Sequence, residues 1–352
     1  MKTVSRFISA AILLSLSAGL FWLARTYPVP FGVVYPQFST WILGVLGNVS
    51  GGASAPIWII GLAVIVVFAI YTLVRAICKG KFLRWLAGLA HGVSFLIFAF
   101  VLLWGVGHAL PTKTERIVTV EKYSAQTLQD ATEYYGAQLD LYASQMARDE
   151  KGNIIMPAFE VLAEEAEEVS FALSARYPTI PAAELKVKKL PLDDVFGHLG
   201  ITGIFVPITA ESSVSGHTYA PSLPHTMCHE LAHRLGCTAE EDANFIGYLA
   251  CLESDETEFL YSAAYSAFIY CFNALYEADE TAANTVWSHR SDLARRDISG
   301  ANDHYEPYEG TVQDVSQKFN DTYLKLSGEE AGVKSYDLVS DALVAWYLKN
   351  KE

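Results

Sequence analysis

The sequence predicts a mainly α-helical protein with a small β element, behind three N-terminal transmembrane helices. Long apolar runs occupy the first third, and amphipathic helical patterns with one β-rich stretch occupy the rest. The charges divide the same way: residues 1–111 hold seven basic and no acidic residues, out of 25 basic and 39 acidic in the 352-residue chain. Residues 112–352 therefore carry 18 basic and 39 acidic residues. We expect a membrane domain over 1–111 and a water-exposed domain over 112–352.

Three apolar runs approach the roughly 20 residues that a membrane-spanning helix needs. They cover residues 7–24, 56–74 and 85–106, and none contains an internal ionised side chain. The segment 26–55 between the first two has no charge, and its Gly-rich part 47–53 is typical of a flexible outer loop. These runs predict an integral membrane protein with three spans.

Basic residues mark the cytoplasmic side of these spans. Lys2 and Arg6 precede the first run, and four basic residues occupy the short link 75–84 between the second and third. The positive-inside rule then predicts a membrane protein with a cytoplasmic N-terminus and an extracytoplasmic C-terminal domain. If the first run is instead a cleaved signal peptide, the remaining topology is unchanged.

The excess of acidic residues argues against nucleic acid and anionic lipid as partners of the outer domain. Five cysteines show no CxxC pair, and only Cys78 falls on the cytoplasmic link. We expect the outer four to be small buried residues, although a disulfide such as Cys251 to Cys271 stays open.

Helical and β patterns follow one another along the outer domain. Residues 124–150 and 157–176 read as amphipathic helices, and 185–190 and 203–209 as the only convincing β-rich part. A helix follows from Pro224 to a stop at Gly236. Thr238 and Glu241 form a capping-box pattern for the next helix, which runs to about residue 252. Residues 259–276 are apolar but contain four tyrosines, so we expect a buried helix rather than another span.

The helix from Pro224 carries the motif HExxH, formed by His229, Glu230 and His233. Residues four apart lie on one helical face, so both histidines can bind one Zn²⁺. Glu230 is rotated about 100° from His229, where a carboxylate can deprotonate a metal-activated water. The motif predicts a zinc peptidase, and with the preceding strands it indicates a zincin-like domain.

The third zinc ligand has two candidates. Glu240, with Ala243 and Asn244, has the form ExxA[DN], in which the last side chain supports a ligand histidine. Asp242 is the competitor. The pattern HExxHxxGxxH does not fit, because Ala239 occupies the position of its last ligand. Both Glu240 and Asp242 stay open.

Two further polar residues near the motif could take part in the chemistry. His225 lies one turn before His229, and a local hydrogen-bonding or substrate-side role fits it better than a ligand role, which would close the water position. Tyr261 could donate a hydrogen bond to the oxyanion that forms during attack, although core packing also explains it.

The motifs together resemble the bacterial membrane proteins grouped as domain of unknown function 3810. The likeness covers nearly the whole chain and is carried by four segments: 103–105, 224–236, 240–245, and the late stretch 320–325 with 332–336. It implies three spans and a zinc-peptidase-like site, but no substrate. One departure is Asp242, where members of the family usually have glutamate.

The sequence therefore predicts a membrane-anchored zinc metallopeptidase that acts on peptide or protein substrates, with Glu230 activating the water. The alternative is a non-catalytic, zinc-stabilised envelope scaffold or sensor. An intramembrane protease is disfavoured, because the motif helix contains Arg234 and is followed by three consecutive acids. A transporter is disfavoured because the spans contain no ionised residue.

Overall fold

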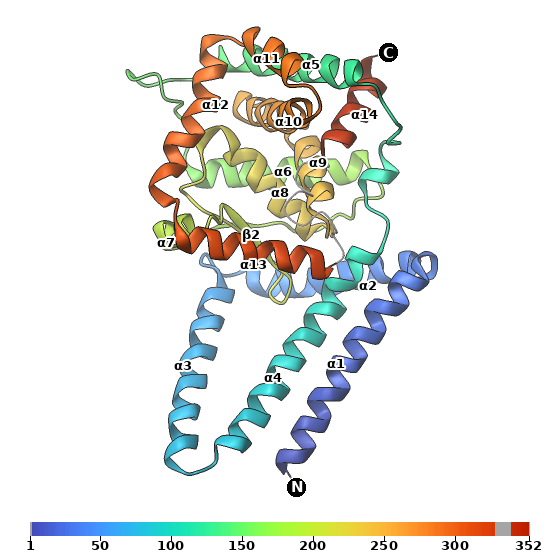
Figure 1. Cartoon of the computed structure of the whole chain (residues 1–352), viewed down its shortest axis with the longest axis vertical. Coiled ribbons are helices and arrows are strands. Elements are labelled where there is room, and N and C mark those ends of the chain that lie inside the picture. The colour runs from blue at the N-terminus through green and yellow to red at the C-terminus, as the bar shows by residue number, and fades with distance from the viewer. Residues whose placement is uncertain (1, 328–338, 352) are drawn as a thin grey trace. The chain divides into compact units, whose positions relative to one another are not determined.

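A computed structural model describes residues 2–327 and 339–351 (Figure 1). The chain is mainly helical, with one small sheet. It divides into two compact units. The first comprises Met1–Pro111 together with Val206–Glu211, and the second comprises Thr112–Phe205 and Ser212–Glu352. The late stretch 332–336, which contributes to the family resemblance, lies outside the described residues.

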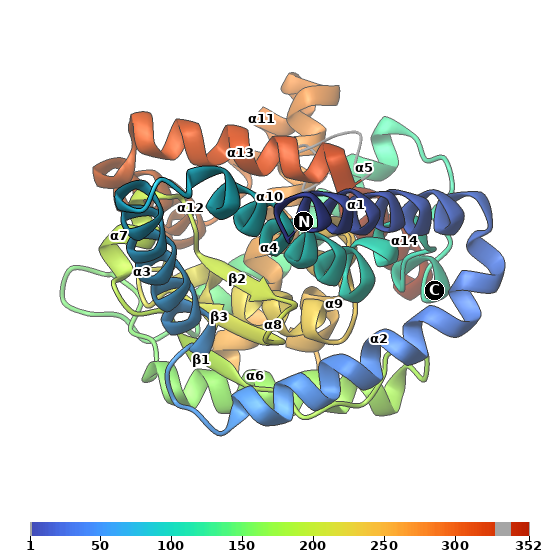
Figure 2. The ribbon, with the colours of Figure 1, turned by 90° about the horizontal axis from the view of Figure 1, so that it is seen from below.

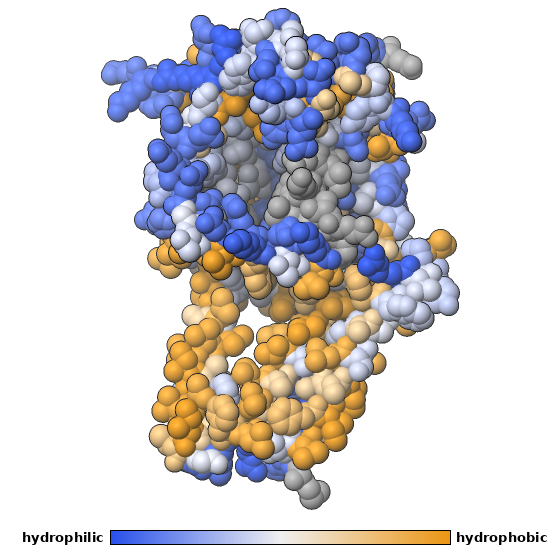
Figure 3. Space-filling model, viewed as in Figure 1, coloured by the Kyte–Doolittle hydropathy of each residue, from blue (hydrophilic) through white to orange (hydrophobic). Residues whose placement is uncertain are grey.

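Three long apolar helices dominate the first unit: α1 (Lys2–Thr26), α3 (Ile57–Cys78) and α4 (Phe82–Leu103). Figure 3 shows hydrophobic residues over the visible sides of these helices. On α3, for example, Val67 and Phe68 are 67% and 65% exposed. Apolar surface of this extent is typical of a lipid-facing helix rather than of a water-soluble bundle.

The helices α1 and α4 run parallel along their length. At one end the guanidinium of Arg6 lies against Gly88, and at the other Ala24 and Val106 belong to one buried cluster. The basic residues predicted to be cytoplasmic therefore gather at one end of the unit.

A fourth apolar helix, α2 (Pro28–Gly51), replaces the flexible loop predicted for this segment. Among the described residues, α1, α2, α3 and α4 are long and apolar enough to cross a membrane. However, α2 runs across the ends of the other three instead of alongside them (Figures 1 and 2). Its Ser39 hydroxyl donates to the carbonyl of Leu103, the last residue of α4, at 3.2 Å. Tyr35 packs with Ala24 and Val106, beside the short helix η1 (Gly105–Ala109).

Segment Val206–Glu211 belongs to this first unit. The carboxylate of Glu211 accepts hydrogen bonds from the N–H groups of Ile57 at 2.8 Å and Trp58 at 3.0 Å. These are N–H groups that the first turn of α3 leaves without an intrahelical partner. Glu211 is thus a cap supplied from a distant part of the chain.

The second unit is built around α10 (Thr257–Ala278), the helix predicted to be buried. Figure 1 shows α10 in the middle of this unit, and eleven of its residues are buried. The helices packed against it include α5 (Ala125–Ala143), α8 (Leu223–Arg234), α9 (Glu240–Cys251) and α14 (Val339–Lys351). The remaining elements of the unit are α6 (Phe159–Arg176), α7 (Asp193–His198), α11 (Glu280–Ser288), α12 (Asp292–Tyr305), α13 (Thr311–Ser327), and the 3₁₀ turns η2 (Thr114–Arg116), η3 (Ala220–Ser222) and η4 (Glu306–Tyr308).

A three-stranded sheet in the order β1-β3-β2 accompanies these helices. The strands are β1 (Val187–Lys189), β2 (Gly203–Val206) and β3 (Glu211–Val214), and β1 pairs with β3 in parallel. Only four residues join β2 to β3, so these neighbours run antiparallel. The strands β1 and β2 lie within the predicted β-rich segments. The strand β3 was not predicted, because its Ser212 and Ser213 resemble turn residues, yet both are buried.

Candidate metal centre

The helix α8 ends at Arg234, two residues before the predicted stop signal Gly236, and the turn at Gly236 shapes the site. Gly236 has a φ of +89°, a conformation that glycine adopts without steric cost. Its N–H donates to the carbonyl of His233 at 2.8 Å, and the N–H of Cys237 donates to that of Ala232 at 3.0 Å. These two bonds form a Schellman motif.

That turn brings the carbonyl of Cys237 back onto His233. The Nδ1 atom of His233 lies 2.6 Å from this carbonyl oxygen, which can only accept, so Nδ1 carries the proton. The Nε2 atom of a neutral His233 then keeps its lone pair for a metal. The left-handed Gly236 therefore helps to fix the tautomer of a candidate ligand.

His229, His233 and Glu240 bring their ligand atoms together. Nε2 of His229 lies 3.3 Å from Oε2 of Glu240, and Nε2 of His233 lies 3.7 Å from Oε1. Two ligand atoms bound tetrahedrally to zinc, at its usual bond lengths, stand about 3.3 Å apart. This is the His, His and carboxylate group that the described residues offer a metal ion, with all ligand atoms within 4.8 Å of one another. The donor set and spacing fit zinc.

Close contact between α8 and α9 places Glu240 on the two histidines. The helices lie side by side (Figure 2), and a Cβ atom added at Gly247 of α9 would stand 3.0 Å from the backbone nitrogen of His229. A larger residue at 247 would push the helices apart. A glycine in the middle of a helix is a signal for such a contact, but we did not predict the role of Gly247.

Glu230 lies beside this cluster, and one of its carboxylate oxygens is left unsatisfied by the described residues. Its Oε2 atom is buried and has no hydrogen-bond partner among residues 2–327 and 339–351. Burial raises the pKa of Glu230 to about 7, although His229 and His233 act in the opposite direction. A carboxylate of this kind is suited to exchange a proton near neutral pH.

The strands β2 and β3 hold Glu230 in position. A Cβ atom added at Gly203 of β2 would lie 2.4 Å from Oε1 of Glu230, so any larger residue would displace this carboxylate. From β3, the hydroxyl of Ser212 donates to the carbonyl of Glu230 at 2.7 Å. The ring of Phe205 on β2 stacks with that of His233, with centroids 6.3 Å apart. Neither Gly203 nor Ser212 was predicted to belong to the site.

In the metal-free protein the ligands form an ion pair. Burial alone lowers the pKa of His233, but the charge and hydrogen bond of Glu240 outweigh it and raise the pKa to about 9. Burial likewise raises the pKa of Glu240, but His233 and His229 outweigh it and hold that pKa well below its usual range. A metal that binds here must displace the proton of His233, so metal affinity will depend on pH.

Comparison with known proteins places this chain in a family. The sequence pattern of the family described as "Protein of unknown function (DUF3810)" matches residues 34–344, nearly the whole chain. The chain belongs to this family. No curated protein and no solved structure matches the chain.

In this DUF3810 protein Asp242 lies away from the cluster of His229, His233 and Glu240. Its carboxylate accepts hydrogen bonds from the N–H groups of Lys113 and Thr114 at 3.1 and 2.8 Å, and from the Thr114 hydroxyl at 2.7 Å. Two residues along a helix correspond to a rotation of about 200°, so Glu240 and Asp242 face different sides. Of the two candidates, only Glu240 joins the histidines, and the departure from the family pattern at 242 does not affect the ligand set.

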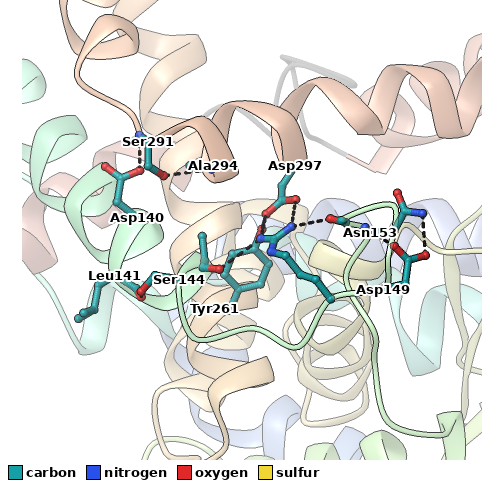
Figure 4. A network of polar contacts seen from close by, with 12 residues as sticks. Asp140, Leu141, Ser144, Asp149, Asn153, Tyr261, Ser291, Ala294 and Asp297 are labelled. Atoms are coloured by element: carbon teal, nitrogen blue, oxygen red, sulfur yellow. Dashed lines mark hydrogen bonds and ion pairs between the residues drawn. The ribbon is translucent and has the colours of Figure 1, made fainter.

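Tyr261 also lies outside the cluster. Its hydroxyl donates to Oδ2 of Asp297 at 2.6 Å (Figure 4), and Arg148 pairs with the same carboxylate at 2.6 Å. These residues join α10 to α12 and to the loop after α5. The hydroxyl of Tyr261 is thus engaged in the core, and the predicted oxyanion role has no support in its position.

His225 makes local hydrogen bonds, one of the roles predicted for it. Its Nε2 atom lies 3.1 Å from the carbonyl oxygen of Asn244, and its N–H donates to the hydroxyl of Ser262. Burial lowers its pKa to about 4, so the ring is neutral. The side chain of Asn244 does not take the predicted supporting role: its Nδ2 and the Nδ1 of His229 are both buried without a partner among the described residues.

The predicted capping box is wrong. The N-cap of α9 is Ala239, not Thr238, and no side chain donates or accepts a capping hydrogen bond there. The cysteines behave as predicted: all five are free thiols, and the outer four are buried.

Proposed function

We propose that this protein is a membrane-anchored zinc metallopeptidase that hydrolyses peptide bonds. One observation carries the proposal: a buried carboxylate oxygen of Glu230, without a hydrogen-bond partner among the described residues, stands beside two histidines and a glutamate whose ligand atoms lie within 4.8 Å of one another. A structural zinc site needs only its ligands, and the extra carboxylate would then cost stability without a return.

The residues divide the chemistry among them. Zinc held by His229, His233 and Glu240 would polarise a peptide carbonyl and acidify a water. Glu230 takes the proton of the attacking water and delivers it to the amine that leaves. Its raised pKa, about 7, suits both halves of this transfer. The hydrogen bond from His233 to Cys237 keeps the imidazole oriented throughout.

The strand β2 is suited to hold an extended substrate. It forms one edge of the sheet, its Gly203 contacts Glu230, and its Phe205 stacks with His233. A peptide that pairs with an edge strand gains backbone hydrogen bonds whatever its sequence. A peptide along β2 would pass both the candidate base and a candidate metal ligand.

We also propose that α1, α3 and α4 span the bacterial cell membrane and that α2 lies at its outer surface. Support comes from the packing of α2 against the ends of α1 and α4 that lie opposite Lys2, Arg6 and the basic link 75–84. A single basic residue of the first unit, Arg25, lies at this end. Three crossings would place the second unit outside the cytoplasm. A fourth crossing by α2 would place it inside.

A non-catalytic scaffold or sensor is the second candidate. Its support is the burial of the ligands, whose side chains are only 7% to 15% exposed and join α8 to α9. Such a protein would bind zinc without turnover.

Peptide hydrolysis separates the two candidates. The full chain, purified in detergent, is treated with a chelator, dialysed, and assayed on a mixture of peptides before and after one equivalent of zinc is restored. We expect cleavage only in the zinc-loaded protein. Zinc uptake with no cleavage of any peptide would favour the scaffold, and no zinc uptake would exclude both.

A further inference from the structure

A pocket lies in the second unit, next to the strand β2 whose Gly203 contacts Glu230. It has a volume of about 180 Å³, and its principal lining residues are Thr202, Ser215, His217, Tyr305, Tyr308 and Gln313. The N–H of Ser215 donates to the carbonyl of Thr202 at 2.7 Å, which closes the end of the β2–β3 hairpin. Because Thr202 immediately precedes Gly203, the pocket begins one residue from the contact with Glu230.

Glycines give this pocket its aromatic wall. A Cβ atom added at Gly197 would stand 2.7 Å from the ring of Tyr308. Gly200, with a φ of +67°, leaves similar room for Gln313. The His217 ring meets that of Tyr308 edge to face, at 5.9 Å between centroids. The pocket therefore presents ring surfaces to whatever enters.

An exposed carboxylate, that of Asp194, stands beside two of the residues that line the pocket. Oδ1 of Asp194 lies 3.4 Å from Nε2 of His217 and 3.5 Å from the hydroxyl of Tyr308. No lysine or arginine is among the residues that line it. The ammonium group of Lys189 and the carboxylate of Asp193 both lie beside Gly216, so the positive charge of Lys189 offsets the negative charge of Asp193. Asp194 is left as an exposed acid at the rim, with its side chain 82% exposed.

We propose that this pocket binds an arginine or lysine side chain of the peptide substrate, which sets the specificity of the cleavage. The inference rests on the proposed peptidase function. The methylene stem of such a side chain can lie along Ile201 and Tyr305, while its cation meets the tyrosine rings and Asp194. If the peptide pairs antiparallel with β2, the side chain that reaches Thr202 lies on the carboxyl side of the cleaved bond.

The test uses a library of synthetic peptides and mass spectrometry to locate every cleavage. The zinc-loaded full chain is compared with Asp194→Asn, Tyr308→Ala and the control Asp292→Asn, which changes an aspartate with a side chain 97% exposed on α12. We expect arginine and lysine to be enriched at one position after the cleaved bond. That enrichment should fall about fivefold in Tyr308→Ala and about threefold in Asp194→Asn, and should persist in the control.

The other outcomes separate the two proposals. Cleavage without a basic preference, or with one that Asp194→Asn and Tyr308→Ala leave unchanged, overturns this inference and leaves the peptidase proposal standing. If the zinc-loaded protein cleaves no peptide, the proposed function fails and this inference fails with it.

Discussion

Glu230 enters the folded protein with one carboxylate oxygen that no described residue satisfies. Its pKa rises from 4.5 to about 7 on folding, so between these values the folded state binds more protons than the unfolded state. The stability of the metal-free protein should therefore fall as pH rises from about 4.5 to about 7. A neutral glutamine of the same shape removes this dependence.

We predict that Glu230→Gln stabilises the metal-free protein at pH 8, by up to about 3 kcal/mol, and has little effect at pH 5. Thermal unfolding in detergent with a chelator, measured at both pH values, checks this. A variant less stable than the wild type at pH 8 would show that Glu230 is a structural residue rather than a strained one.

The position of the Glu230 carboxylate also depends on Gly203, which leaves room for it. A methyl group at this position meets the flexible end of Glu230, which must move. We predict that Gly203→Ala lowers kcat about a hundredfold, as misplacement of a reacting group by about 1 Å does. Zinc content and melting temperature should stay close to those of the wild type. Equal loss of zinc and stability would mean that the contact only serves packing.

The helix α9, packed against α8, carries one carboxylate that faces the candidate metal centre and another that stabilises the fold. Glu240 and Asp242 are two residues apart, yet one faces the histidines and the other accepts three hydrogen bonds from Lys113 and Thr114. We predict that Glu240→Gln weakens zinc binding at least about tenfold. Asp242→Asn should leave zinc affinity nearly unchanged but cost about 1 to 3 kcal/mol of stability.

Zinc titration and thermal unfolding of the two variants check this prediction side by side. The pair serves as its own control, since each variant changes one carboxylate to an amide on the same helix. If Asp242→Asn abolished zinc binding while Glu240→Gln retained it, the assignment of the third ligand would be reversed.

The position of α8 could be predicted from the sequence because residues at its own two ends determine where it starts and stops. Pro224 and Gly236 bound α8 because the first helical turn tolerates proline and the left-handed turn favours glycine. The strand β3 and the third ligand depend on contacts between distant segments, so Ser212 looked like a turn and Asp242 like a ligand. The helix α2 was missed because its glycines and prolines resemble a loop in water, whereas a backbone in or near lipid must satisfy its own hydrogen bonds.

The whole molecule carries a natural probe of its topology. Cys78 ends α3 on the basic side of the first unit and is the one exposed cysteine among the five. If three helices span the membrane, Cys78 faces the cytoplasm. We predict that a membrane-impermeant maleimide labels the protein in inverted vesicles but not in intact spheroplasts, and that Cys78→Ser abolishes the labelling.

A second position completes the topology test. Ser288 is exposed at the end of α11 in the second unit. In the Cys78→Ser background, Ser288→Cys should be labelled in intact spheroplasts. Protection of position 288 there, with labelling in inverted vesicles, would place the second unit in the cytoplasm and add α2 to the spans.

In the proposed reaction Glu230 performs chemistry beside a zinc that it does not bind. The most direct measurement determines zinc per chain and peptide turnover on the same preparations of wild type and Glu230→Gln. We predict one zinc in both, and a fall in turnover of about a hundredfold or more in the variant. Equal turnover in the two zinc-loaded proteins would contradict the claim.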